Sequence, residues 1–397
     1  MRNIVLYFGS KSTSRLGTIV HEIAVLWLAF KLGHSPFAVS LVLVAGNLPA
    51  FLMVPLTGLI ADRVRPLTVL VTIDVIRALI IGSFAFMQWR SFPGLLGFEA
   101  LVVALTSVYG STFSAVQRRL FANPSQARIT GLLATFEQAA QFVAAPLAGV
   151  LILARSTWAC LWLDAATYLV SACILSGFFS VVNEIAPSPF TTSTAITDGA
   201  WDYLSKNPFV IYLIALSAFG VAIEGGLVTV FPMYVSHLPR GPAYLGILMA
   251  SFSVGAALAG LTLQGALRWL SSWLAPAMFL GSGLGIIAFT LVPMPISILP
   301  ATLVGFCLGT LVFGVRAASY GVVEKKFQGR VSSARFAAHS VLTATVTLTI
   351  GGLATDLGVY WTLLGTGIVL TVVLPYMVHR MSSDSKITQA INNVVGE

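Results

Sequence analysis

Several ionisable side chains stand well inside long apolar segments, where each could bind a proton or a polar solute. Among them are Glu22, Glu137, Glu224 and His339. An ionised side chain at the centre of a bilayer costs on the order of 2.5–3.5 kcal/mol, so a residue of this kind is a candidate for function. A carboxylate and an imidazole that face a wet cavity can both exchange protons. We therefore expect these four residues to line a central substrate and proton cavity, together with Gln141, which shares a helical face with Glu137.

Asp74 and Arg77 stand three residues apart in another apolar segment. On a helix this spacing puts both side chains on one face, where an ion pair lowers the cost of burying either charge. The pair could belong to the transport cavity or act as a structural clamp, and the sequence does not decide between the two. Glu99 and Asp164 are expected near the outer ends of their helices, within reach of water and in mostly structural roles.

The two halves of the chain repeat at a common offset of 202 residues. Sliding the sequence on itself by this distance aligns Glu22 with Glu224 and Glu137 with His339, without a gap. Each match is weak by itself, and the shared offset is what indicates a duplicated unit.

The composition excludes a soluble globular protein. The chain has 397 residues, of which 57% are hydrophobic and 9% charged, and a mean hydropathy of +0.91. No soluble domain tolerates so apolar a surface. The three cysteines all lie in apolar segments and form no C-x-x-C pair, so neither a disulfide framework nor a zinc site is indicated.

Apolar runs of about 20 residues are long enough to cross a bilayer as helices. The sequence predicts an all-α membrane protein with twelve such spans, at 15–32, 37–61, 67–89, 93–117, 129–154, 157–182, 208–236, 243–267, 273–293, 296–322, 331–354 and 357–380. The spans divide into two six-helix halves. We expect an N-terminal half at 1–182, a cytoplasmic linker at 183–207, a C-terminal half at 208–381 and a cytoplasmic tail at 382–397.

Lysine and arginine indicate the orientation. Of the 22 basic residues, Lys31, Arg90, Arg155 and Arg240 fall in segments assigned to the outside, and nearly all the others fall in segments assigned to the inside. This bias predicts that both termini are cytoplasmic. The net charge of +8 is spread over short loops, so topology explains it and nucleic-acid binding does not.

The turn between the second and third predicted spans has the sequence GLIADRVR, at residues 58–65. It resembles the loop signature of the major facilitator superfamily. Gly58, Asp62 and Arg63 match that signature, whereas Arg65 stands where a second glycine is usual. We expect Asp62 to act in an inner gate at the cytoplasmic end of its helix. The other residues of this gating loop are Gly58, Arg63 and Arg65, with Arg118 and Arg119 as cationic neighbours.

The end of the fifth predicted span, residues 145–150, resembles the Gly-Pro-x-x-Gly-Gly motif of antiporters in this superfamily. Pro146 and Gly149 match, and two other glycines are replaced. Pro146 would bend the helix and Gly149 would permit close packing, which are also ordinary uses of these residues in membranes.

Over nearly its whole length, the chain looks most like the bacterial macrolide-efflux and siderophore-exporter branch of the superfamily. The resemblance implies a monomer in a bacterial inner membrane that exports a small organic molecule in exchange for protons, without a cofactor. Uptake, or flipping of a lipid or metabolite, is the alternative within the same fold. An intramembrane enzyme or a non-transporting sensor is a further alternative, although the sequence contains neither G-x-x-x-x-G-K-[ST] nor G-x-S-x-G.

Overall fold

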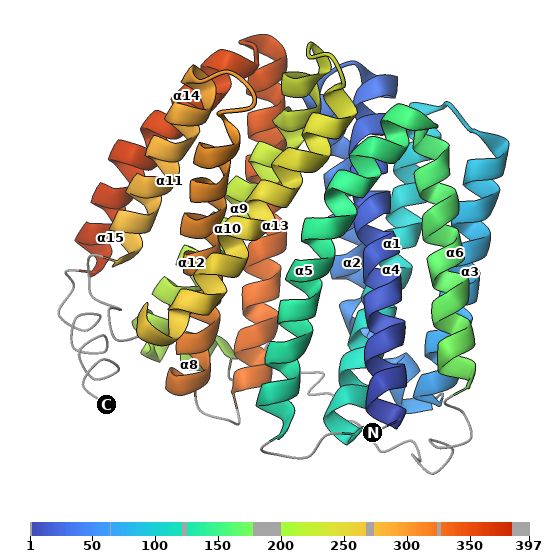
Figure 1. Ribbon diagram of the computed structural model, residues 1–397. Coiled ribbons are helices and arrows are strands. Elements are labelled where there is room, and N and C mark those ends of the chain that lie inside the picture. Colours follow the sequence, from blue (N-terminus) through green and yellow to red (C-terminus); the bar gives the residue numbers. More distant parts are fainter. Residues whose placement is uncertain are drawn as a thin grey trace. The chain divides into compact units, whose positions relative to one another are not determined.

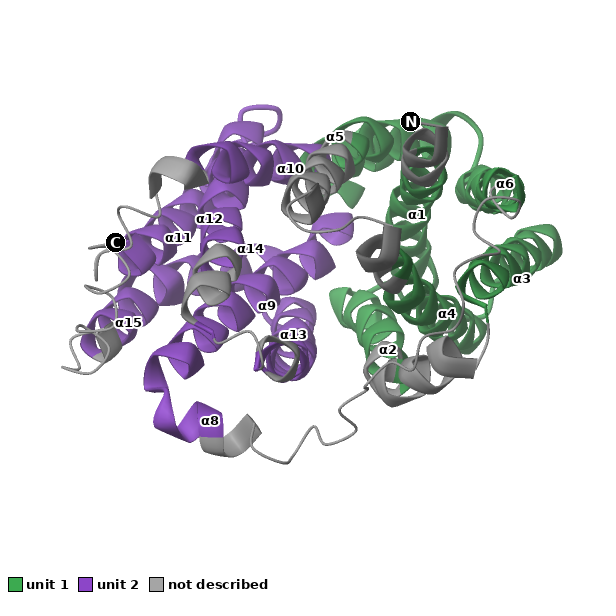
Figure 2. Cartoon of the chain, turned by 90° about the horizontal axis from the view of Figure 1, so that it is seen from below, with its two compact units in different colours: residues 1–194, 235–249 green, residues 195–234, 250–397 purple. Residues whose placement is uncertain are grey.

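The computed structural model of the chain describes residues 2–63, 65–120, 125–177, 200–266, 274–323 and 327–382. Every regular element within these ranges is a helix (Figure 1). The chain divides into two compact units, which Figure 2 shows in two colours. Unit 1 comprises residues 1–194 and 235–249, and unit 2 comprises residues 195–234 and 250–397.

Six helices form most of unit 1. They are α1 (Arg2–Gly33), α2 (Pro36–Arg63), α3 (Pro66–Met87), α4 (Phe92–Leu120), α5 (Ser125–Ala154) and α6 (Thr157–Ser176). α1 packs against α5 and α6, α3 against α4 and α6, and α2 against α4. One apolar cluster between α3 and α4 includes Leu70, Ile73, Tyr109 and Phe113.

Unit 2 holds most of the remaining helices. They are α8 (Ala200–Lys206), α9 (Pro208–Ser236), α10 (Gly241–Ala266), α11 (Leu274–Leu291), α12 (Ile298–Val322), α13 (Gln328–Asp356), α14 (Val359–Ile368), the π-helix η2 (Val369–Val373) and α15 (Leu374–Ser382). The start of α10 belongs to unit 1. The short α8 buries Tyr203 and Leu204 against Val323 and Val331. The last predicted span is one helical stretch in which the π-helix η2 separates α14 from α15.

The apolar helices agree with a membrane protein of many spans. In the part of the chain that the structure describes, ten helices are long and apolar enough to cross a membrane, and residues 36–49 and 140–154 form two shorter apolar stretches. Local signals place the helix ends. Pro66 lies at the first turn of α3, and the hydroxyl oxygen of Ser156 accepts a hydrogen bond from the Ala159 N–H at the start of α6.

Two predicted helix ends lie farthest from the observed ones. The first span was predicted to begin at residue 15, but α1 begins at Arg2. Hydropathy misses this first part because Ser10 and Ser14 are polar, although both are buried. The sixth span was predicted to run to residue 182, but α6 ends at Ser176, and Gly177 follows it as a turn residue.

Candidate functional site

Polar side chains join α1 to α6 along much of their length. The hydroxyl groups of Ser10 and Ser171 lie 2.9 Å apart, and those of Thr18 and Tyr168 also lie 2.9 Å apart. The two helices run antiparallel, so residues farther along α1 contact residues nearer the start of α6. Gly17 lies in the same interface, and a Cβ added there would stand 2.6 Å from Asp164 Oδ1. A residue larger than glycine would therefore force the two helices apart.

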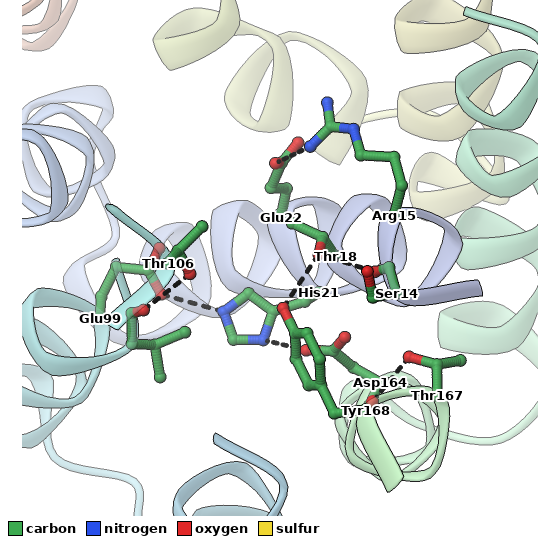
Figure 3. A network of polar contacts seen from close by, with 11 residues as sticks. Ser14, Arg15, Thr18, His21, Glu22, Glu99, Thr106, Asp164, Thr167 and Tyr168 are labelled. Atoms are coloured by element: carbon green, nitrogen blue, oxygen red, sulfur yellow. Dashed lines mark hydrogen bonds and ion pairs between the residues drawn. The ribbon is translucent and has the colours of Figure 1, made fainter. Parts of the chain in front are cut away.

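His21 continues this interface and contacts two carboxylates at once (Figure 3). Its Nδ1 lies 3.1 Å from Asp164 Oδ2 on α6, and its Nε2 lies 3.1 Å from Glu99 Oε2 on α4. All three residues are buried, with 3%, 0% and 9% of His21, Asp164 and Glu99 exposed. The Phe98 ring lies 5.6 Å from the imidazole, centre to centre. An imidazole and two carboxylates thus meet out of reach of most solvent.

This cluster differs from the sequence-based expectation. Water was expected within reach of both Asp164 and Glu99. The expectation is wrong for Asp164, whose side chain is fully buried, whereas 12% of the Glu99 side chain is exposed. His21 was not singled out as a site residue. The sequence feature that could have identified it is a histidine in the middle of an apolar span, beside the carboxylate of Glu22.

Glu22 projects from another side of α1. It points away from His21, and its Oε1 lies 3.0 Å from Arg15 Nη1 (Figure 3). The Glu22 side chain is 46% exposed. Successive residues on a helix are rotated by about 100°, which separates the buried imidazole from the exposed carboxylate.

Asp74 and Arg77 form the ion pair that their spacing allows. Asp74 Oδ1 lies 3.7 Å from Arg77 Nη1, and both residues are buried. The Ser171 hydroxyl donates a hydrogen bond of 2.7 Å to Asp74 Oδ2. The guanidinium carbon lies 4.5 Å from the Tyr109 ring centre and 4.7 Å from that of Tyr168. Arg77 is therefore held between two aromatic faces, an arrangement that stabilises a buried cation.

The candidates of unit 2 lie on α9 and α13. Glu224 is exposed on α9. His339 on α13 is half-buried, and its Nε2 lies 2.9 Å from the Ser217 hydroxyl on α9. Since that hydroxyl already donates its single proton to Ile214 O at 3.0 Å, it accepts from His339, which places a proton on Nε2.

Several predicted site residues have side chains outside the described part of the chain. They are Gly58, Asp62, Arg63, Arg118, Arg119 and Glu137. The backbone places Asp62 and Arg63 in the last turn of α2, which continues to Arg63 although the prediction ended it at residue 61. Arg65 lies exposed just before α3. Gln141 lies half-buried on α5.

The segment of α5 that resembles the antiporter motif packs closely against the start of α10, within unit 1. A Cβ added at Gly149 would lie 2.9 Å from Ala243 Cα, and one added at Gly246 would lie 3.1 Å from Pro146 Cα. The prediction that Gly149 permits close packing is therefore confirmed. A role of Pro146 and Gly149 in antiport stays a prediction.

Metal coordination has no support among the described residues. No group of three or more His, Cys, Asp or Glu side chains there is arranged to hold a metal ion. In the His21 cluster, both ring nitrogens face carboxylates instead of a shared cation site.

Solved structures of transporters share this fold. A bacterial homologue of the iron transporter ferroportin, in an inward-facing state, superposes with a TM-score of 0.73 at 15% identity over 96% of this chain and 99% of that one. The peptide transporter POT in complex with sulfate gives a TM-score of 0.73 at 12% identity, over 99% of this chain and 95% of that one. At these identities the similarity shows the fold alone.

Sequence comparison places the chain in a family. It is 26% identical over 223 residues to YfiS, an MFS-type transporter of Bacillus subtilis (strain 168). The aligned residues cover 53% of this chain and 51% of that protein. The chain thus matches about half the length of this relative. The model of the Major Facilitator Superfamily matches residues 12–241, more than half of the chain. The protein therefore belongs to the Major Facilitator Superfamily and is a multi-pass membrane protein.

Proposed function

We propose that this transporter exports a small organic molecule, drug-like or siderophore-like, in exchange for protons. Export would proceed by alternating access of two six-helix halves, in a bacterial inner membrane with both termini cytoplasmic. The chain would act as a monomer and without a cofactor. The sequence has no phosphate-binding loop of the G-x-x-x-x-G-K-[ST] type, which favours an ion gradient over ATP as the direct energy source.

The observation that carries this proposal is the set of ionisable groups buried in the helices of unit 1. His21, Glu99 and Asp164 are each at most 9% exposed. Buried charges are costly in a membrane protein, and they are typical of proton and substrate pathways. A structural anchor would have no need of so many.

The central cavity is proposed to include Glu22 and Glu224, which the repeat relates to each other. Both are exposed on the helices that carry them, as residues lining a wet cavity must be. Glu137, Gln141 and His339 complete this set. Proton binding at one of these carboxylates would compete with a bound polar or cationic substrate, and this competition supplies the exchange.

The inner gate is proposed to lie at the end of α2. Asp62 would hold the cytoplasmic side shut through Arg118 or Arg119, with Gly58, Arg63 and Arg65 shaping the loop. The Asp62→Asn variant should keep its expression level and its thermal stability but lose most transport, because the two gate states then differ less in free energy. Full transport by this variant would remove Asp62 from the gate.

Transport into everted membrane vesicles tests the proposed function. Respiring everted vesicles acidify their interior, so a proton-coupled exporter accumulates its substrate inside. We expect at least one compound from a panel of macrolides, catechol chelators and organic cations to accumulate, and an uncoupler to abolish the accumulation. Vesicles without the protein are the control. Accumulation that is insensitive to the uncoupler, or that occurs only in right-side-out vesicles, would contradict proton-driven export and favour uptake or flipping.

A further inference from the structure

The position of His21 between two carboxylates determines how many protons the cluster holds. Each ring nitrogen lies 3.1 Å from a carboxylate oxygen. The contact of Nε2 with Glu99 has the geometry of a hydrogen bond, whereas the contact of Nδ1 with Asp164 has the distance of an ion pair without that geometry. A nitrogen lone pair and an ionised carboxylate repel each other, so each contact needs a proton between its two atoms. A neutral imidazole carries one N–H and one lone pair, whereas the imidazolium carries two N–H groups. The arrangement with both contacts formed therefore contains one proton more than a neutral imidazole between two carboxylates.

The groups around His21 leave this count unchanged. On α1, Glu22 turns away to Arg15. On α6, the Tyr168 hydroxyl is bonded to Thr18, and on α3, Asp74 and Arg77 pair with each other. Residues 36–49 of α2 and 140–154 of α5, whose side chains the structure describes and whose helices also pack on α1, include no ionisable residue.

The two carboxylates differ in what happens when the extra proton leaves. Asp164 is fully buried, whereas 12% of the Glu99 side chain is exposed. A carboxylate without a partner is much less costly where water can reach it. The contact with Glu99 is therefore the one that opens, and the contact with Asp164 is the one that stays.

The packing of α1 supports the same asymmetry. Besides His21, α1 is joined to α6 by the Ser10–Ser171 and Thr18–Tyr168 hydrogen bonds and by the close approach at Gly17. The contact between His21 and Glu99 is the polar link from this part of α1 to α4. Losing it removes this polar link, while Lys11 still lies over the Phe113 ring of α4 nearer the start of α1 and the contacts of α1 with α6 remain.

We propose that His21, Glu99 and Asp164 form a proton-binding site that links α1 to α4 only when it is loaded. On unloading, the Nε2–H bond breaks, the electron pair stays on Nε2, and the proton passes to water beside Glu99. The imidazole keeps its Nδ1–H, which faces the Asp164 carboxylate. The inference rests on the proposed function only in identifying this proton as the one that is coupled to export.

Nitrogen NMR of the full chain with 15N-labelled histidine tests the proton count without any transport. The spectrum distinguishes an imidazolium from each neutral tautomer. The His21 signals are identified by their loss in His21→Gln, and His237→Gln, on an exposed turn, is the matched control. Should His21→Gln fail to fold, replacing His34, His237, His339 and His379 in turn identifies His21 by elimination.

At pH 7 we expect His21 with both ring nitrogens protonated. On raising the pH, it should convert to the neutral form that keeps the proton on Nδ1. In Glu99→Gln, which lacks the second carboxylate, the neutral form should already be present at pH 7. A neutral His21 in the wild type at pH 7, or an unchanged imidazolium in Glu99→Gln, would overturn the proposal.

A distance measurement tests the helix movement. Spin labels are placed on exposed positions in a Cys173→Ser background, one pair at Lys31 on α1 and Leu101 on α4, the other at Lys31 and Arg155 beside α6. Raising the pH should change the first distance distribution and leave the second unchanged. Two unchanged distributions would refute the link to α4. Failure of proton-driven transport with the expected NMR result would instead overturn the proposed function and leave the proton site standing.

Discussion

Asp74 and Arg77 stand one helical turn apart on α3, with Oδ1 3.7 Å from Nη1 and with both side chains buried. Ser171 on α6 and the rings of Tyr109 and Tyr168 complete their surroundings. The pair thereby joins α3 to α4 and α6 in the interior of unit 1. These contacts favour a structural clamp, one of the two roles that the spacing of the pair leaves open.

Removing one member of this pair should destabilise the protein strongly. Arg77→Met leaves Asp74 buried without its cation, and breaking a buried ion pair in this way costs about 3–5 kcal/mol. We expect a large drop in the thermal unfolding midpoint of the purified protein. Asp74→Asn combined with Arg77→Met should recover part of that loss, and Arg155→Met, at an exposed arginine, should change little. A wild-type midpoint for Arg77→Met would show that the pair is no clamp.

Gly17 should be intolerant of even a methyl group. The added Cβ of Gly17→Ala would lie 2.6 Å from Asp164 Oδ1 and 2.9 Å from Thr167 Cβ, which side-chain rotation cannot move away, so α1 and α6 must separate. Overpacking of this kind costs about 1–3 kcal/mol. The control is Gly97→Ala on α4, where a Cβ meets nothing within 4 Å and alanine should be neutral or stabilising. Equal thermal midpoints for the two variants would contradict the close approach of the helices.

Part of this structure follows from the sequence by local rules. Apolar runs located the helices, and the i, i+3 spacing indicated the Asp74–Arg77 pair, because both observations depend on a single helix. The His21 cluster could not be found in this way, since its three members come from α1, α4 and α6. No sequence pattern states which turn of one helix faces which turn of another. The sequence does not distinguish the buried His21 from the exposed Glu22 beside it, because packing alone decides which side of α1 is buried.

Glu22→Gln should affect transport but not stability. The ion pair with Arg15 is partly exposed and contributes at most about 1 kcal/mol, so the thermal midpoint should hardly move. If Glu22 carries the coupled proton, proton-driven export is lost while substrate exchange without a gradient continues. Arg15→Gln is the matched control, because it removes the ion pair and keeps the carboxylate. Glu137→Gln and Glu224→Gln are assayed in the same way, and normal export by all three variants would refute the cavity assignment.

The orientation in the membrane is tested with single cysteines in a Cys173→Ser background. Arg90 is exposed between α3 and α4, and Ser383 lies outside the described residues. In intact cells, an impermeant thiol reagent should label Arg90→Cys at once and Ser383→Cys only after lysis. The reverse pattern would invert the proposed topology.

The movement of protons against substrate is the most direct test of the account as a whole. Purified protein in liposomes that enclose a pH-sensitive dye is exposed to a compound from the vesicle panel, with no other ion gradient imposed. For every molecule that moves down its gradient, antiport predicts a proton flow in the opposite direction, seen as a pH change inside that is absent from protein-free liposomes. Substrate movement with no pH change, or with protons moving in the same direction, would contradict proton-coupled export.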